Sequence, residues 1–123
     1  MTSTGPDKEL LGALSRDATS TIVGIAVSSM GRPRVAEIMG VTPSMVSKYV
    51  HGRSKPPADR LARLLEEFDK YSYVEALYTI FEDLLHKLLR MAGILSYYVE
   101  QGFEPPPRVV LLLREVDRRL EEL

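Results

Sequence analysis

Apolar residues recur along this chain at alternating steps of three and four, a pattern that predicts α-helices. The longest stripe runs from Val74 to Tyr98, and a shorter one occupies residues 108–123 after three consecutive prolines at 105–107. Both stripes are wide, so each helix needs more than one neighbour to cover it. We therefore expect a long and a shorter helix that form a C-terminal helical hairpin over residues 71–123.

Helix signals also occupy the N-terminal part of the chain. Residues 1–18 are predicted to be a polar tail followed by a short helix that begins at Asp7. Ser20 or Thr21 is the expected N-cap of a second helix that ends at Met30, although the β-branched run beginning at Thr21 also suits a strand. A further helix is expected to end near Phe68. Within the long C-terminal stripe, Gly93 is the expected position of a kink or break.

Residues 32–52 (RPRVAEIMGVTPSMVSKYVHG) have small, glycine and apolar positions at the spacing of two short helices joined by a tight turn. Ala36 has a small side chain where the helices would cross, and Gly40 tolerates the positive φ that ends the first helix. Thr42 is the expected N-cap of the second helix, and Pro43 is its first residue. The pattern predicts a helix-turn-helix.

The second of these helices is expected to have a buried and an exposed side. Val46 and Tyr49 should turn inward together with Val35 and Ile38, and Val41 should be buried beneath both helices. The exposed side then consists of Ser44, Ser47, Lys48 and His51. Such a polar helix suits the DNA major groove, where hydroxyl groups and a lysine can reach base edges.

The segment resembles the Cro and lambda-repressor type of helix-turn-helix regulators. The residues that carry the resemblance are Ala36, Gly40, Val41, Val46, Tyr49 and the segment HGRSKPP at 51–57. The resemblance extends from about Thr19 to Phe68 and implies a DNA-binding domain over residues 19–70. It also implies a helix directly before Arg32, which favours helix over strand for the run at Thr21. The implied fold class is all-α: a lambda-repressor-like domain followed by the helical hairpin.

In this family the second helix reads bases, and the loop after it grips phosphate. The resemblance implies DNA base contacts at Thr42, Pro43, Ser44, Ser47 and Lys48, and DNA phosphate contacts at Arg32, Arg34, His51, Arg53 and Lys55. The chain departs from the family at Pro43, since the family often has a hydrogen-bond donor there and proline has none. Readout should therefore depend on Ser44 and Lys48 or on DNA shape.

Charge is distributed unevenly along the chain. Residues 32–63 carry seven Lys or Arg and two Asp or Glu, a net charge of +5, while residues 1–31 carry −1 and residues 64–123 carry −5. The near-neutral total of −1 thus conceals a basic segment on the motif itself. A basic surface of this kind is what binding to phosphate requires.

A single recognition helix contacts only a few base pairs and discriminates weakly between sequences. A two-fold dimer reads two half-sites about 34 Å apart, so we expect a homodimer. The C-terminal hairpin is the expected dimerisation unit. In the alternative, its apolar stripes complete a monomeric core. The predicted dimer interface consists of Val74, Leu77, Phe81, Leu84, Leu88, Met91, Leu95, Tyr98, Leu112, Val116 and Leu120.

Other classes of function find little support in the sequence. The chain has no cysteine, its two histidines His51 and His86 have no carboxylate at metal-ligand spacing, and no phosphate loop or nucleophile elbow occurs. We expect no enzyme activity, no metal and no cofactor. The longest apolar run outside the motif is too short to span a bilayer, so we expect a cytoplasmic protein that binds no membrane.

The sequence therefore predicts a site-specific regulator of transcription, most simply a repressor, that binds a palindromic operator in double-stranded DNA as a homodimer. Two alternatives belong to other classes. In one, an antitoxin-like or assembly protein uses the C-terminal hairpin to bind a second protein. In the other, a DNA-organising or partition factor binds with little base specificity.

Overall fold

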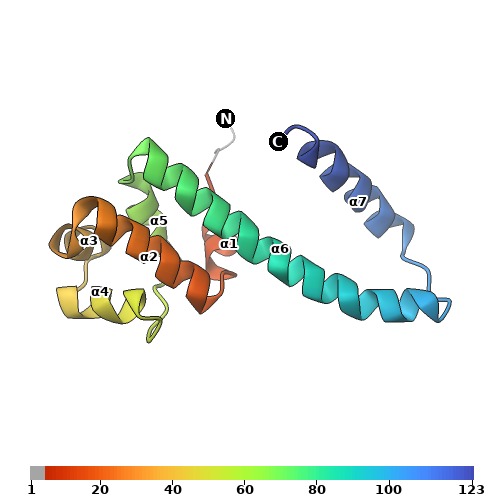
Figure 1. Cartoon of the computed structure of the whole chain (residues 1–123), viewed down its shortest axis with the longest axis horizontal. Helices are drawn as coiled ribbons and strands as arrows, with labels where there is room; N and C mark the ends of the chain where they lie inside the picture. Colours follow the sequence, from red (N-terminus) through yellow and green to blue (C-terminus); the bar gives the residue numbers. More distant parts are fainter. Residues whose placement is uncertain (1–4) are drawn as a thin grey trace. The chain divides into compact units, whose positions relative to one another are not determined.

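The computed structural model describes residues 5–123, and the polar residues predicted as a tail at 1–4 lie outside this range. The described chain is all-α, as predicted (Figure 1). Its helices are α1 (Lys8–Gly12), α2 (Arg16–Met30), α3 (Arg32–Met39), α4 (Pro43–Val50), α5 (Ala58–Glu66), α6 (Lys70–Glu100) and α7 (Pro107–Leu120). Among the described residues, no helix has both the length and the apolar character needed to cross a membrane.

The chain forms two compact units, of which unit 1 ends at His86 and unit 2 is Lys87–Leu123. Unit 1 extends on both sides of the predicted 19–70 domain. Leu11 of α1 and Ile80 of α6 belong to the same buried cluster as α2 to α5. The N-terminal helix and the first half of α6 therefore complete the core of the predicted DNA-binding domain, since without them that core would be open to solvent.

The beginning of α2 differs from the prediction. Ser15, rather than Ser20 or Thr21, caps this helix by accepting a hydrogen bond from the Ala18 amide at 3.1 Å. Asp83 of α6 in turn accepts bonds from the Ser15 amide and hydroxyl at 3.1 and 2.5 Å. The β-branched run after Ser20 is helical because it is buried inside unit 1, where packing overrides its strand propensity.

Helix α6 presents to the core a different side from the predicted seam. Ser72, Ala76 and Ile80 are its buried residues, whereas Val74 of the predicted seam is 42% exposed. The helix is continuous through Gly93, so the expected break is not present. The buried line and the predicted seam lie on adjacent sides of one helix and meet near Leu84, a seam residue that is partly buried against the core of unit 1.

Unit 2 contains the last turns of α6 and all of α7, joined by a turn that begins at Gly102, whose φ is +98°. The amide of Phe103 donates to the Tyr98 carbonyl at 3.0 Å, which closes the end of α6. Both predicted C-terminal helices are therefore present. No residue of α7 is buried, however, so the two helices of the expected hairpin leave their apolar sides uncovered.

Asp69 joins the end of α2 to the start of α6. Its carboxylate accepts hydrogen bonds of 2.9 Å from the Ser72 amide, the Ser72 hydroxyl and the Ser29 hydroxyl. The bond from the Ser72 amide contributes most to lowering the pKa of Asp69 below its ordinary value of 3.8, followed by the hydroxyl of Ser29. The ionised carboxylate is thus the form that the folded state favours.

This lowered pKa predicts a pH-dependent contribution to stability. Because the folded-state pKa lies below the unfolded one, the contribution is present above the unfolded pKa and is lost as the pH falls through the folded pKa. We expect Asp69→Asn to lower the Tm at pH 6, and we expect this difference to shrink as the pH falls below about 4. Thermal melts of both proteins from pH 7 to pH 2.5 test this. The exposed carboxylate variant Glu66→Gln is the control, and a difference that stayed constant over this pH range would contradict the assignment.

Candidate nucleic-acid interface

The predicted turn between α3 and α4 is present as expected. Gly40 ends α3 with a φ of +67°, and the Val41 amide donates to the Ala36 carbonyl at 3.0 Å. Thr42 caps α4 by accepting a hydrogen bond from the Met45 amide at 3.2 Å, and Pro43 is the first helical residue. Local residue preferences alone were sufficient to predict this geometry.

The buried side of the two helices agrees with the prediction in most positions. Val35, Val46 and Tyr49 are buried in the core. Ile38 and Val41, which were expected to be buried, are only partly so, and the fully buried residue at the end of α3 is Met39. The core therefore reaches the last turn of α3 through Met39.

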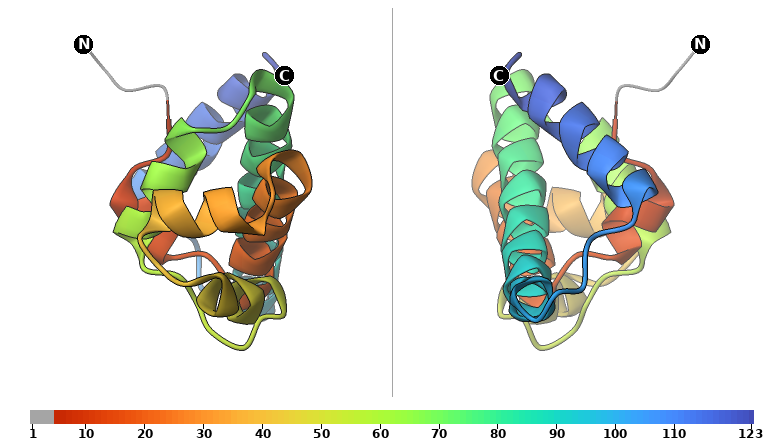
Figure 2. Two further views of the ribbon diagram at one scale, coloured as in Figure 1. Left: turned by 90° about the vertical axis from the view of Figure 1, so that its left-hand side faces the viewer. Right: turned by 90° about the vertical axis from the view of Figure 1, so that its right-hand side faces the viewer.

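Helix α4 lies at the outer edge of unit 1 and crosses α3 at a large angle. In Figure 1 α4 is seen from the side while α3 is seen nearly end-on. In the left view of Figure 2 α3 is seen from the side and α4 nearly end-on. Ser44, Lys48 and His51 are exposed on the outer side of α4, and Ser47 is partly exposed. The structure thus brings the predicted base-contacting side chains together on one solvent-facing side.

Ser47 already uses its hydroxyl proton within α4. Its Oγ donates to the Pro43 carbonyl at 3.3 Å, one turn earlier in the helix. The end of α4 is closed by the Arg53 amide, which donates to the Lys48 carbonyl at 2.9 Å, and Gly52 has a φ of +70°. This turn places the Arg53 side chain directly after the exposed side of α4, as the phosphate prediction requires.

The basic side chains of the segment have different environments. Arg32, Lys48 and Arg53 are exposed and make no ion pair within residues 5–123. Arg34 pairs with Glu37 at 3.0 Å and with Glu67 at 3.8 Å. Arg34 is therefore partly neutralised inside the folded chain.

Lys55 and Arg60 have structural partners that the charge count did not predict. Lys55 donates to the Gly12 carbonyl at the end of α1 at 3.0 Å. Arg60 of α5 donates through Nη1 to the carbonyls of Met39 and Gly40 at 2.6 and 3.0 Å. The Arg60 guanidinium thus satisfies carbonyls at the end of α3 and holds α5 against the turn.

Comparisons with known proteins agree with this geometry. Residues 33–75 match the model of a family described as Helix-turn-helix. The matched range covers α3, α4, α5 and the first turns of α6. No curated protein and no solved structure matches the chain.

The positive φ at Gly40 predicts a specific cost of substitution. In Gly40→Ala the alanine would have to adopt the left-handed backbone conformation of Gly40, and its Cβ would lie 3.3 Å from Arg60 Nη1. We expect the free energy of unfolding to fall by about 1–2 kcal/mol. Gly24→Ala is the matched control, because a Cβ at Gly24 within α2 meets nothing within 4 Å and should raise stability by about 0.5–1 kcal/mol. Urea unfolding measures both, and equal responses at the two positions would contradict this account.

The hydrogen bonds of Arg60 predict that it matters more for folding than the other arginine of α5. Arg60→Met keeps much of the side-chain volume but leaves two carbonyls without their donor, so we expect a loss of about 1.5–3 kcal/mol in the free energy of unfolding. Arg63→Met is the control, since Arg63 is exposed and makes no ion pair within residues 5–123. If the two variants unfolded at the same urea concentration, the structural role of Arg60 would be wrong.

Proposed function

We propose that this chain is a cytoplasmic, sequence-specific regulator of transcription, because residues 33–75 match the helix-turn-helix family and resemble the Cro and lambda-repressor type. The proposed form is a repressor that binds a palindromic operator as a homodimer. The observation that carries the proposal is the exposed polar side of α4, which includes Lys48 and is followed directly by Arg53, both without an ion pair within residues 5–123. Such a helix offers base-edge contacts in its middle and phosphate contacts at its margins.

In the proposed complex, α4 enters the major groove with Ser44, Ser47 and Lys48 toward the base edges. Thr42 and Pro43 contact the bases at the start of the helix, where Pro43 contributes shape and apolar contact rather than a hydrogen bond. Lys48 can donate to guanine, which makes it the main candidate for base discrimination.

The proposed phosphate contacts flank α4 at Arg32, Arg34, His51, Arg53 and Lys55. Arg32, His51 and Arg53 are exposed and need no rearrangement to reach a phosphate. Arg34 and Lys55 would exchange their partners inside the chain, Glu37 and the Gly12 carbonyl, for the DNA backbone. We therefore assign the larger share of the salt-dependent affinity to Arg32 and Arg53.

Repression would follow from occlusion of a promoter that overlaps the operator. Two copies would place their recognition helices in half-sites about 34 Å apart and would add their binding energies. The proposed dimer contacts come from the apolar side chains of α6 and α7. Those from Leu88 onward are exposed in the single chain, whereas Leu77, Phe81 and Leu84 are partly buried.

The same exposed side chains favour a second candidate function. In an antitoxin-like or assembly protein, α6 and α7 would bind a different protein while the basic domain attached the complex to DNA. A binding protein of this kind would show an uncovered apolar surface when alone, as this chain does.

Selection of bound sequences from random duplex DNA, combined with mass determination of the complex, tests the proposal. We expect a palindromic motif that is bound by two copies of the chain. Bound DNA without a motif would instead indicate an organising or tethering role, and the absence of binding at physiological salt would overturn the proposed function.

Two substitutions separate base readout from phosphate binding. Lys48→Ala should cost about 1–3 kcal/mol on the selected operator and less on unrelated DNA, because it removes a base contact. Arg53→Ala should weaken binding to all sequences alike and reduce the salt dependence, because it removes a phosphate contact. Fluorescence anisotropy on operator and scrambled duplexes measures both effects, with Arg63→Ala as the control. Identical behaviour of the Lys48 and Arg53 variants on every duplex would show that the roles are assigned wrongly.

A further inference from the structure

Unit 2 exposes an unusual amount of apolar surface. Apart from Leu111 on the charged side of α7, its large apolar side chains that are at least 40% exposed are Leu88, Leu89, Met91, Ile94, Leu95, Tyr97, Tyr98, Val99, Phe103, Leu112, Leu113, Val116, Leu120 and Leu123. At roughly 50 Å² or more for each side chain, their total approaches the ~800 Å² that one partner contributes to a standard interface. Extensive apolar surface left in water is typical of sites that bind another protein.

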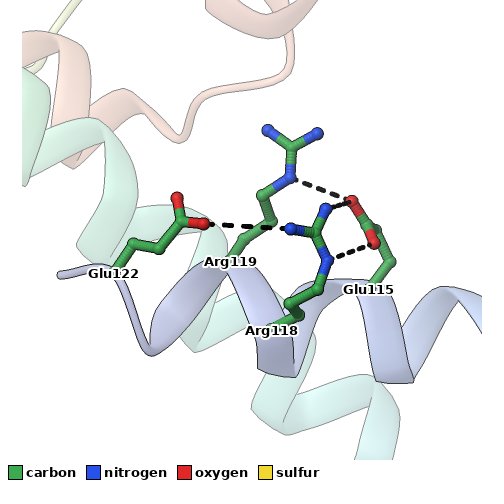
Figure 3. Close-up of polar contacts among 4 residues, drawn as sticks. All are labelled: Glu115, Arg118, Arg119 and Glu122. Carbon is green, nitrogen blue, oxygen red and sulfur yellow. Dashed lines mark hydrogen bonds and ion pairs between the residues drawn. The ribbon is translucent and has the colours of Figure 1, made fainter.

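Helix α7 has two distinct sides. One carries an apolar stripe that includes Leu112, Val116 and Leu120, each of which is exposed. The other carries Glu115, which accepts hydrogen bonds from Arg118 at 2.5 and 3.0 Å and from Arg119 at 2.9 Å (Figure 3). Arg118 also pairs with Glu122 at 3.8 Å. The charged side is thus satisfied within the helix, and only the apolar stripe lacks a partner.

The connection between α6 and α7 explains why the two stripes leave each other uncovered. The end of α6 is closed by the hydrogen bond from Phe103 to Tyr98, and Phe103 also packs edge-on against the Tyr98 ring at 6.3 Å. The prolines at 105–107 then form a stiff connection, in which Pro106 has the extended angles φ −60° and ψ 148°. Although both helices have apolar stripes, no residue of α7 is buried.

From these observations we infer that a second copy of this chain covers unit 2, with α7 of each copy packed on the apolar side of α6 of the other copy. The inference rests on the homodimer of the proposed function and adds the exchange of α7 between the copies. In a dimer with a two-fold axis this exchange is reciprocal: α7 of the first copy packs on α6 of the second, and α7 of the second packs on α6 of the first.

Charge favours a second copy as the occupant. Residues 87–123 contain six Lys or Arg and six Asp or Glu, so this part of the chain has no net charge. Two copies therefore approach without repulsion between like net charges, and their uncovered stripes have the same chemistry. An acidic or basic partner protein would have no complementary field to meet here.

Cross-linking tests the exchange directly, because the chain has no cysteine of its own. The full-length double variant Met91→Cys/Val116→Cys carries one thiol in α6 and one in α7, and each single variant serves as a control for links between like helices. Treated with a bifunctional maleimide, the double variant should give a covalent dimer on a denaturing gel. This link between α6 and α7 should disappear when the variant is first mixed with an excess of the natural chain.

A link within one chain that persists under this dilution would overturn the exchange. Sedimentation of the natural chain without DNA provides the second arm, and a monomer at micromolar concentration would overturn the inference in favour of a different protein partner. Both measurements omit DNA, so their failure is distinguishable from a failure of the proposed operator binding.

A matched pair of adjacent leucines tests the stripe of α7. Leu112→Glu places a charge in the stripe and should raise the dimer dissociation constant at least about tenfold. Leu111→Glu makes the same chemical change outside the stripe and should alter that constant by less than about threefold. Because no residue of α7 is buried, circular dichroism should show unit 1 equally folded in both variants. Equal dissociation constants for the two variants would overturn the inference.

Discussion

Burial of α2 is the constraint on which the rest of unit 1 depends. Ile22, Val23 and Ala26 of this helix are completely removed from solvent, and serines along the same helix bind its neighbours. Ser20 donates to the Val50 carbonyl at the end of α4. Ser15 donates to the carboxylate of Asp83 in α6, and Ser29 donates to the carboxylate of Asp69, directly before α6. Helix α4 and the first half of α6 are therefore positioned against the same buried helix. Since a close-packed core resists small shifts, the exposed side of α4 has a defined orientation in unit 1.

Features that depend on neighbouring residues could be predicted from the sequence. The turn at Gly40 and the N-cap at Thr42 follow from local backbone preferences, and the inward positions of α4 follow from helical periodicity. The beginning of α2 could not be predicted in this way, because Ser15 is held by Asp83, which lies far away in the chain. The same reason applies to α6, where periodicity indicates an apolar stripe but does not show which side meets the core.

The candidate site shows a similar division between local and tertiary information. The exposed positions of Ser44 and Lys48 could be predicted from the helix alone, whereas a count of basic residues treated all arginines and lysines of the segment alike. In the folded chain Arg60 binds carbonyls at the end of α3, and Lys55 binds a carbonyl of α1. These partners lie in separate helices, so no local pattern identifies them. The basic segment thus combines side chains that stabilise the fold with side chains that remain available for a ligand.

The hydrogen bond from Ser47 to Pro43 determines what Ser47 can offer a base pair. A hydroxyl group has one proton, and in α4 that proton is already directed to the Pro43 carbonyl. As long as this bond is kept, Ser47 has its lone pairs for a further partner, so it can accept from the amino group of adenine or cytosine. Lys48 beside it can only donate. The two adjacent residues would therefore contact different groups in the major groove: Ser47 an amino group of adenine or cytosine, and Lys48 an acceptor such as O6 or N7 of guanine.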